Sequence, residues 1–286
     1  MKQYLNLLEK VLVEGEWQDN RTGIPTLRLD GAMLQFDLTK GFPAVTTKKL
    51  AFNQVKGELI GFIRGYDNAG AFRGVGCNIW DQNANENQAW LGSNARKGQD
   101  DLGRIYGQQW RSWPKDICGH IDQLKEAVNK VMDEPTSRRI IVSAWNPADM
   151  DRMALPPCHI MFQLLVDIKN GTLSMCMYQR SCDLFLGIPF NIASYALLLE
   201  LIAHVTGYKA KQLTMFLADV HIYKNHMEQV TEQLSREPIT LPALLLCDAI
   251  AGRNCDPFKQ LELIVPSDIM LIDYQHREAI KAEMAV

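Results

Sequence analysis

The amino-acid sequence predicts a single α+β domain that spans residues 1–286. Two observations support this fold class. Stretches in which apolar residues recur at helical spacing alternate with shorter strand-like runs. Asn170-Gly171, the strongest short signal for a β-hairpin, separates two of those runs, Ile160–Ile168 and Thr172–Tyr178. With 47% hydrophobic residues and no repeat or low-complexity stretch, the chain can bury a large core.

In the first half of the chain, helices are predicted where apolar side chains share one face. Residues 4–12 and residues 52–63 both show this pattern, and a glycine soon follows each of them. Between them, Asn20–Gly23 is a polar turn and Met33–Leu38 alternates like a strand. Residues 82–103 are rich in polar side chains, so we expect an excursion over the surface and not a linker between domains.

In the second half, a helix is predicted over residues 121–131, followed by a short apolar strand at Ile140–Val142. After the hairpin, a long apolar helix should run from about Ile192 to Thr206, where a glycine closes it. A further helix is predicted from about Ile222 to Arg236, ahead of a proline that cannot continue it. These elements complete the mixture of helices and hairpins.

Composition and charge narrow the partners and the compartment. The formal net charge is −3, so no global basic field attracts nucleic acid, and an anionic ligand must be small and held by a local cluster of arginines. The N-terminus lacks the apolar core of a signal peptide, and polar residues interrupt the most apolar stretch, Ile192–Val205, so we expect a buried helix and no membrane span. Seven cysteines without metal-ligand spacing favour free thiols, no metal site and a cytoplasmic location.

Cys158 is the first candidate for chemistry. It lies between a pair of prolines and an apolar strand, where most cysteines are buried structural thiols. His159 follows it directly, but sequence neighbours on a strand point to opposite faces, so adjacency alone indicates no catalytic pair. A cysteine hydrolase that used both residues would need a glycine-rich turn or an oxyanion loop, and neither accompanies them in the sequence.

Four residues are candidates for binding a phosphate group. Arg180 and Ser181 directly follow a hairpin strand, and a guanidinium group matches phosphate oxygens, although a single arginine is as often part of an ordinary surface ion pair. Arg138 and Arg139 open an apolar strand, where a basic pair is most often a solvated strand end. Each of these signals is weak alone.

Four further polar residues are candidates because of where they lie in the predicted helices and strands. Asn191 precedes the long apolar helix, where it could cap the helix or read a pyrimidine edge by donating and accepting at once. His221 and Tyr223 share one face if the backbone there is extended. Glu58 interrupts the apolar face of its helix and is either a surface residue or a proton relay with a shifted pKa.

Together, these residues lie in motifs that closely resemble the thymidylate synthase family. The motifs are Asp19–Gly23, Phe42–Lys49, Tyr106–Arg111, Ser137–Ile141, Pro157–His159, Gln179–Asp183, Gly187–Asn191 and His221–Tyr223. The likeness runs from about Tyr4 to the last residue, and the chain ends in Met284-Ala285-Val286, as some members do. Several long motifs in the right order make a chance resemblance negligible. The resemblance implies a homodimer built on a mixed sheet, in which each active site takes two arginines from the partner.

The resemblance also implies a reaction and a nucleotide site. The enzyme would be a methyltransferase of nucleotide biosynthesis that converts dUMP to dTMP, with 5,10-methylenetetrahydrofolate as donor of both carbon and hydride. Cys158 would attack C6 of uracil, and Glu58, Tyr106 and Asn191 would complete the catalytic set. The residues implied in dUMP binding are Arg21, Arg180, Ser181, Asp183, Asn191, His221 and Tyr223, with Arg138 and Arg139 from the other subunit.

Within that site, individual roles follow from the same resemblance. His221 and Tyr223 would hold the ribose 3′-hydroxyl, Asn191 would read the uracil edge, and Glu58 would order water for proton transfers. The arginine cluster should also lower the pKa of the Cys158 thiol. A closing C-terminus would exclude water from the site.

On the folate side, the resemblance implies Lys48, Ile79, Trp80, Asp183, Leu186, Gly187, Phe190 and Val286. Asp183 would form a hydrogen bond with the pterin. Two features depart from the common family pattern. Asn83 stands where many members carry a second tryptophan, and Gln88–Gln99 looks like an insertion found only in some members.

Two other functions compete with this interpretation. A pyrimidine hydroxymethylase would share the thiolate and folate steps but let water quench the intermediate. Asn191 argues against its cytosine-specific form, while Trp80 and the C-terminal residues favour hydride transfer. An RNA-binding regulator, from a different class, fits neither the net charge of −3 nor the complete set of catalytic residue types.

Overall fold

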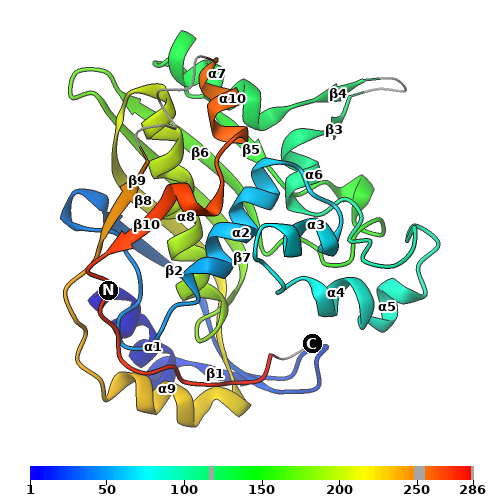
Figure 1. The fold of residues 1–286 in the computed structure, drawn as a ribbon. Helices are drawn as coiled ribbons and strands as arrows, with labels where there is room; N and C mark the ends of the chain where they lie inside the picture. The colour runs from blue at the N-terminus through cyan, green and yellow to red at the C-terminus, as the bar shows by residue number, and fades with distance from the viewer. Residues whose placement is uncertain (116–118, 248–254, 285–286) are drawn as a thin grey trace.

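A six-stranded sheet with the strand order β1-β2-β8-β7-β6-β5 forms the centre of the computed structural model, which describes residues 1–115, 119–247 and 255–284 (Figure 1). The strands are β1 (Glu16–Gln18), β2 (Thr26–Asp37), β5 (Ile141–Ser143), β6 (His159–Asp167), β7 (Thr172–Asp183) and β8 (Lys209–Tyr223). Neighbouring strands are antiparallel except β7 and β8, which are parallel. The sheet is therefore mixed, and the predicted α+β class is confirmed.

Helices pack against one face of the sheet or, like α4 and α5, lie beside it (Figure 1). They are α1 (Lys2–Glu14), α2 (Phe52–Ile63), α3 (Ala69–Gly74), α4 (Asp81–Asn85), α5 (Gln88–Leu91), α6 (Tyr106–Arg111), α7 (Gln123–Asp133), α8 (Gly187–Thr206), α9 (Met227–Leu234) and α10 (Pro257–Glu262). Two small ribbons, β3 (Trp113–Pro114) with β4 (His120–Ile121) and β9 (Ala243–Leu246) with β10 (Ile269–Ile272), lie outside the main sheet. The core lies between the sheet and α1, α2 and α8.

The helix α8 is the buried crossover that makes β7 and β8 parallel. Its start is fixed by Asp183, whose Oδ1 accepts hydrogen bonds from two backbone N–H groups just before the helix. It ends at Gly207, whose φ of 77° is the left-handed cap that glycine adopts freely. The helix is long and apolar enough to cross a membrane, with a mean hydropathy of 1.5, but 78% of that window is buried inside the protein, as a core helix would be.

The start of α8 differs from the prediction. The helix begins at Gly187, not near Ile192, because Pro189 is tolerated in a first turn where its missing N–H has no partner to lose. Asn191 therefore lies inside the helix, and its interpretation as an N-cap is wrong.

The strand β8 also corrects a prediction. A helix from about Ile222 was expected, but the strand continues through Tyr223 and the helix α9 begins only at Met227. The reason is tertiary: β8 pairs with β2 on one side and with β7 on the other, and those ladders hold residues 209–223 extended. No local pattern contains that information.

Other elements agree with the prediction. The helices near residues 4–12, 52–63 and 121–131 correspond to α1, α2 and α7. The hairpin at Asn170-Gly171 joins β6 to β7, with Gly171 at φ 63°. Residues 82–103 carry α4 and α5, and they are anchored by Trp90, which is buried and donates through Nε1 to the carbonyl oxygen of Asp101 at 2.6 Å.

Gly57 in α2 tests how tightly the helices are packed. A Cβ there would lie 2.7 Å from the carbonyl oxygen of Val75 and 2.8 Å from Cβ of Cys77. Gly57→Ala should therefore lower the free energy of unfolding by ~1–3 kcal/mol, although alanine is the better helix former. Gly74→Ala in α3 is the control, since nothing lies within 4 Å of its Cβ. Urea unfolding of both variants measures the difference, and equal stabilities would show that the loop at Val75 yields freely.

Candidate active site

A cleft of about 890 Å³ opens where β7 and β8 end. Its walls come from the turn after β1, the segment 87–93, the loop 145–158 and the last residues of β7 and β8. Six of the predicted site residues line it together: Arg21, Cys158, Arg180, Ser181, His221 and Tyr223. The parallel register explains this convergence, because Ser181 is the neighbour of Asp219, and Asp183 the neighbour of His221, across the two strands.

Cys158 lies half-buried in the cleft wall. Its backbone N–H donates to the hydroxyl of Tyr106 at 2.7 Å, and its carbonyl oxygen accepts from the backbone N–H of Arg180 at 2.8 Å. Burial raises the pKa of the thiol, while Arg180 and Arg21 act in the lowering direction. The predicted lowering of the thiol pKa is therefore wrong for this chain alone. The arginines lower the pKa of the thiol as expected, but the increase caused by burial is larger.

Arg180 is held by the loop that carries the cysteine. Its Nε donates to the carbonyl oxygen of Pro157 at 2.8 Å, and one terminal nitrogen donates to that of Pro156 at 3.0 Å. The guanidinium lies 5.3 Å from the ring centroid of Trp145. These contacts orient a positive charge beside Cys158, as binding of a small anion requires.

Arg21 is carried by the turn predicted at Asn20–Gly23. Asn20 accepts through Oδ1 from the backbone N–H of Thr22 at 2.9 Å and donates through Nδ2 to the carbonyl oxygen of Ile24 at 2.7 Å. Gly23 has a φ of 75°, which a residue with a Cβ rarely adopts. The turn thus places a second guanidinium at the cleft.

His221 and Tyr223 share one face, because β8 is extended through both of them. Their rings meet edge to face, with centroids 5.2 Å apart. Both line the cleft together with Asp219. The prediction that they act as a pair is consistent with this geometry.

Behind Cys158, Glu58 and Tyr106 belong to a buried aromatic cluster. Trp80 donates through Nε1 to Oε1 of Glu58 at 3.1 Å. Burial nevertheless raises the pKa of Glu58 to about 8, so its carboxyl group is protonated at neutral pH. The structure therefore excludes the interpretation of Glu58 as a surface residue.

His159 belongs to the same cluster and is no partner of the thiol. Its ring stacks on Tyr106 with centroids 4.2 Å apart, and its Nδ1 forms a hydrogen bond of 2.7 Å with the hydroxyl of Tyr195. Burial lowers the pKa of His159 to about 3, which makes it a poor base. This geometry does not support a cysteine–histidine hydrolase.

The residues predicted on the folate side lie in two places: Ile79 and Trp80 directly precede α4, and the other described ones lie around the start of α8. Lys48 donates through Nζ to the carbonyl oxygen of Phe185 and lies 3.4 Å from that ring's centroid; burial lowers its pKa to about 7. Oδ1 of Asp183 accepts hydrogen bonds from the backbone N–H groups of Phe185 and Leu186, in the turn just before α8. Trp80 is buried, and the partly buried residues are Ile79, Leu186, Gly187 and Phe190. None of these lines the cleft that contains Cys158, and Val286 lies outside the described residues.

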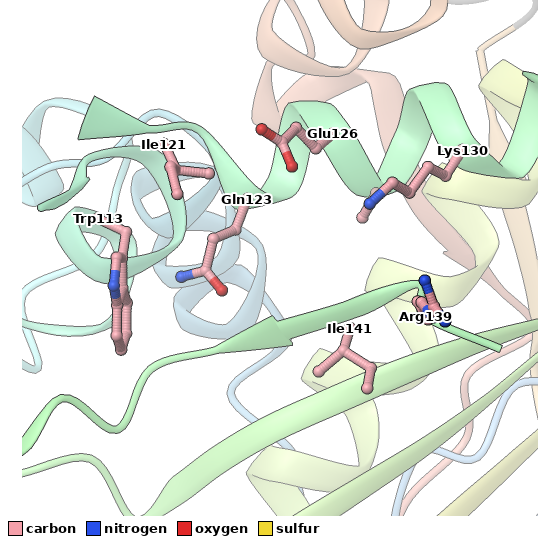
Figure 2. A pocket seen from close by; sticks show the side chains of 8 residues that line it. Trp113, Ile121, Gln123, Glu126, Lys130, Arg139 and Ile141 are labelled. Carbon is pink, nitrogen blue, oxygen red and sulfur yellow. The ribbon is translucent and has the colours of Figure 1, made fainter. Parts of the chain in front are cut away.

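Arg138 and Arg139 are not brought to Cys158 within one chain. Both are exposed ahead of β5. Arg139 instead lines a separate pocket of about 210 Å³, where Figure 2 shows it facing α7 near Lys130 and Ile141. Reaching a cleft from there would require a second copy of the chain.

Several residues of the site escaped the sequence analysis, among them Gln179, Trp145, Trp90 and Asp219. Gln179 donates through Nε2 to Oδ1 of Asn191 at 2.9 Å and so orients that amide. Trp145, Trp90 and Asp219 line the cleft. Asp219 had a readable signal, since it precedes His221 by two residues and must share its face on a strand. Among the described residues, no group of three or more His, Cys, Asp or Glu is placed to hold a metal ion.

A mixed α+β fold whose cleft holds a thiol beside two guanidinium groups is the arrangement expected of an enzyme that binds an anionic substrate next to a candidate nucleophile. Comparison with known proteins identifies a single family. A family model described as thymidylate synthase matches residues 2–286. Thymidylate synthases of Pseudomonas syringae pv. tomato and Pseudomonas putida are 43% and 44% identical, and that of Bordetella parapertussis is 42% identical, each over the full length of both chains. The chain belongs to the thymidylate synthase family, and its function is that of this family of methyltransferases.

Glu58 gives a test of the buried site through stability. Its carboxyl has an ordinary pKa of 4.5 and a folded pKa of about 8, so the protonated group stabilises the fold at low pH and this contribution is lost as the pH rises through about 8. Between these values, wild type should lose ~1.4 kcal/mol per pH unit relative to Glu58→Gln. Urea unfolding of both proteins at several pH values measures the difference.

The matched control is Glu9→Gln, which changes an exposed carboxyl group on α1. The stability difference between this variant and wild type should not change over the same pH range. If Glu58→Gln also differed from wild type by a constant amount, Glu58 would not be protonated in the folded protein.

Proposed function

We propose that the cleft binds dUMP and that Cys158 is the nucleophile that adds to C6 of its uracil ring. The observation that carries this proposal is the convergence of Cys158, Arg21, Arg180 and Ser181 on one cleft. Uracil C5 is a poor nucleophile, and addition of a thiolate at C6 turns the ring into an enolate that can accept a one-carbon unit. The family implies methylenetetrahydrofolate as co-substrate, and it would supply both the carbon and the hydride.

In the proposed site, each part of dUMP would have complementary groups. The phosphate would bind to Arg21, Arg180 and Ser181, with Arg138 and Arg139 from a second chain. The ribose 3′-hydroxyl would bind to His221 and Tyr223. Asn191, oriented by Gln179, would read the uracil edge. Asp183 would contact the nucleotide site and the pterin.

Thiolate formation would need more positive charge, such as that of Arg138 and Arg139 from a second chain. Burial keeps the Cys158 thiol protonated, and the nearest positive charges act against burial. Tyr106, whose hydroxyl contacts the backbone of Cys158, and Glu58, which carries a proton at neutral pH, would order water and move protons on the buried side of the ring. The folate would lie toward Lys48, Ile79, Trp80, Leu186, Gly187 and Phe190, with Val286 closing the site.

The uncovered face of the sheet supports a homodimer. Met33, Phe216 and Tyr178 are neighbours across β2, β8 and β7, and their side chains are 54%, 43% and 40% exposed. Ile141 on β5 and Leu165 on β6 extend this apolar face. A single chain would leave it in water, whereas a second copy would cover it and bring exposed arginines to a neighbouring cleft. We propose further that residues 1–286 form one catalytic domain and act in the cytoplasm, without a metal.

The reaction is tested by incubating the protein with dUMP and methylenetetrahydrofolate. We expect dTMP and dihydrofolate in equal amounts, with release of tritium from [5-³H]dUMP. Hydroxymethyl-dUMP without dihydrofolate would instead identify a hydroxymethylase. Cys158→Ala should abolish turnover and leave dUMP binding measurable by calorimetry. Near-normal turnover in that variant would remove Cys158 from the mechanism.

Sharing of arginines between subunits is tested by mixing two inactive variants. Cys158→Ala lacks the thiol and Arg139→Ala lacks the guanidinium, so each alone should be nearly inactive. After co-refolding, half of the dimers combine both chains and hold one complete site, and about a quarter of wild-type activity should return. A mixture as inactive as its components would show that Arg139 serves its own chain.

A further inference from the structure

Asp219 lines the cleft but has no part in the steps described so far. It lies two residues before His221 on β8, so both side chains project from the same face of the strand. Oδ1 of Asp219 is 2.8 Å from Nδ1 of His221, and the backbone carbonyl oxygen of Asp219 is 3.2 Å from the same nitrogen. Nδ1 of His221 therefore faces two oxygens. The backbone carbonyl oxygen can only accept a hydrogen bond, and the same holds for Oδ1 when the carboxyl group is ionised.

Charges around Asp219 keep the carboxyl group ionised. The hydrogen bond from His221 is the largest cause of its lowered pKa, and Arg28 and Arg180 act in the same direction. Nε of Arg28 is 3.4 Å from Oδ2 of Asp219, and Arg28 is the cross-strand neighbour of His221 on β2. Arg28 also contacts Asp30, so it retains a carboxylate partner of its own. Asp219 is thus fixed on one side by Arg28 and presents its other oxygen to the imidazole.

We propose that Asp219 is a positioning residue that fixes the tautomer of His221. With the proton on Nδ1, the neutral ring presents the lone pair of Nε2 to the cleft. The ribose 3′-hydroxyl would then donate its proton to Nε2 and accept a hydrogen bond from the hydroxyl of Tyr223. Asp219 thereby makes His221 an acceptor, which selects a nucleotide with a free 3′-hydroxyl over one that lacks it. The inference rests on the proposed placement of the ribose at His221.

The tautomer is measured directly in the protein without nucleotide. Nitrogen-15 NMR of the imidazole rings, with the His221 signals assigned from the spectrum of His221→Gln, distinguishes a ring protonated on Nδ1 from one protonated on Nε2. We expect His221 of the wild type to be protonated on Nδ1. A neutral His221 protonated on Nε2 would overturn the proposal without any variant of Asp219 being needed.

Kinetics then test the consequence for recognition. Asp219→Ala should raise KM for dUMP roughly tenfold with a change in kcat of less than about threefold, the size expected for one misdirected hydrogen bond. KM for 2′,3′-dideoxyuridine monophosphate should hardly change, so the preference for dUMP should collapse. Asp219→Asn retains an acceptor oxygen and should recover part of that preference.

Asp30→Ala is a matched control. Asp30 is the cross-strand neighbour of Asp219, carries the same charge and also contacts Arg28, yet it does not line the cleft. We expect it to retain the wild-type preference and the wild-type His221 tautomer. If Asp219→Ala and Asp30→Ala behaved alike, the effect would come from the charge or from Arg28 and the proposal would be wrong.

Failure of this inference is distinguishable from failure of the proposed function. Wild-type protein that is inactive toward dUMP would contradict the function. Wild-type protein that is active but does not distinguish dUMP from its 3′-deoxy analogue would contradict the role of Asp219 in recognition.

Discussion

The parallel pairing of β7 and β8 is the constraint on which the site depends. Two neighbouring parallel strands end at the same edge of a sheet. The polar residues near the carboxyl end of one strand therefore lie beside those near the carboxyl end of the other. Arg180 and Ser181 come from one strand, and His221 and Tyr223 from the other. The helix α8 enforces this arrangement, because a crossover of its length and apolarity can only be buried against the sheet that it connects.

Burial, more than charge pairing, sets the protonation of the site. It raises the pKa of the Cys158 thiol and of Glu58, and it lowers that of His159 and Lys48. In all four cases the neutral form is favoured. These four groups are therefore held neutral in the chain by itself, and further positive charge near Cys158 would be needed to favour its thiolate.

The sequence allowed much of this to be predicted where the information is local. Period-two spacing placed His221 and Tyr223 on one face, and the Asn170-Gly171 turn placed the hairpin before Arg180. Predictions failed where contacts with distant segments determine where a strand or helix begins and ends. The strand β8 extends through Tyr223 because two other strands pair with it, and Asn191 lies inside α8 because the turn at Asp183 starts the helix earlier.

The pKa of Cys158 was predicted wrongly for the same physical reason. Nearby arginines can be read from a motif, but the depth at which packing buries a thiol cannot. The roles of Arg138 and Arg139 remain predictions, since one chain leaves both of them at its surface. Asp219 could have been found from its spacing to His221, had the strand been recognised.

The hydrogen bonds that anchor Arg180 couple the binding of an anion to the position of the Cys158 thiol. Its guanidinium forms hydrogen bonds with the carbonyl oxygens of Pro156 and Pro157, immediately before Cys158, and its backbone N–H donates to the carbonyl oxygen of Cys158 itself. A phosphate that draws on this guanidinium also acts on the peptide that carries the sulfur. If dUMP binds as proposed, the binding energy of its phosphate would also help to position the thiol, so a uracil nucleoside without a phosphate would lose reaction rate as well as affinity.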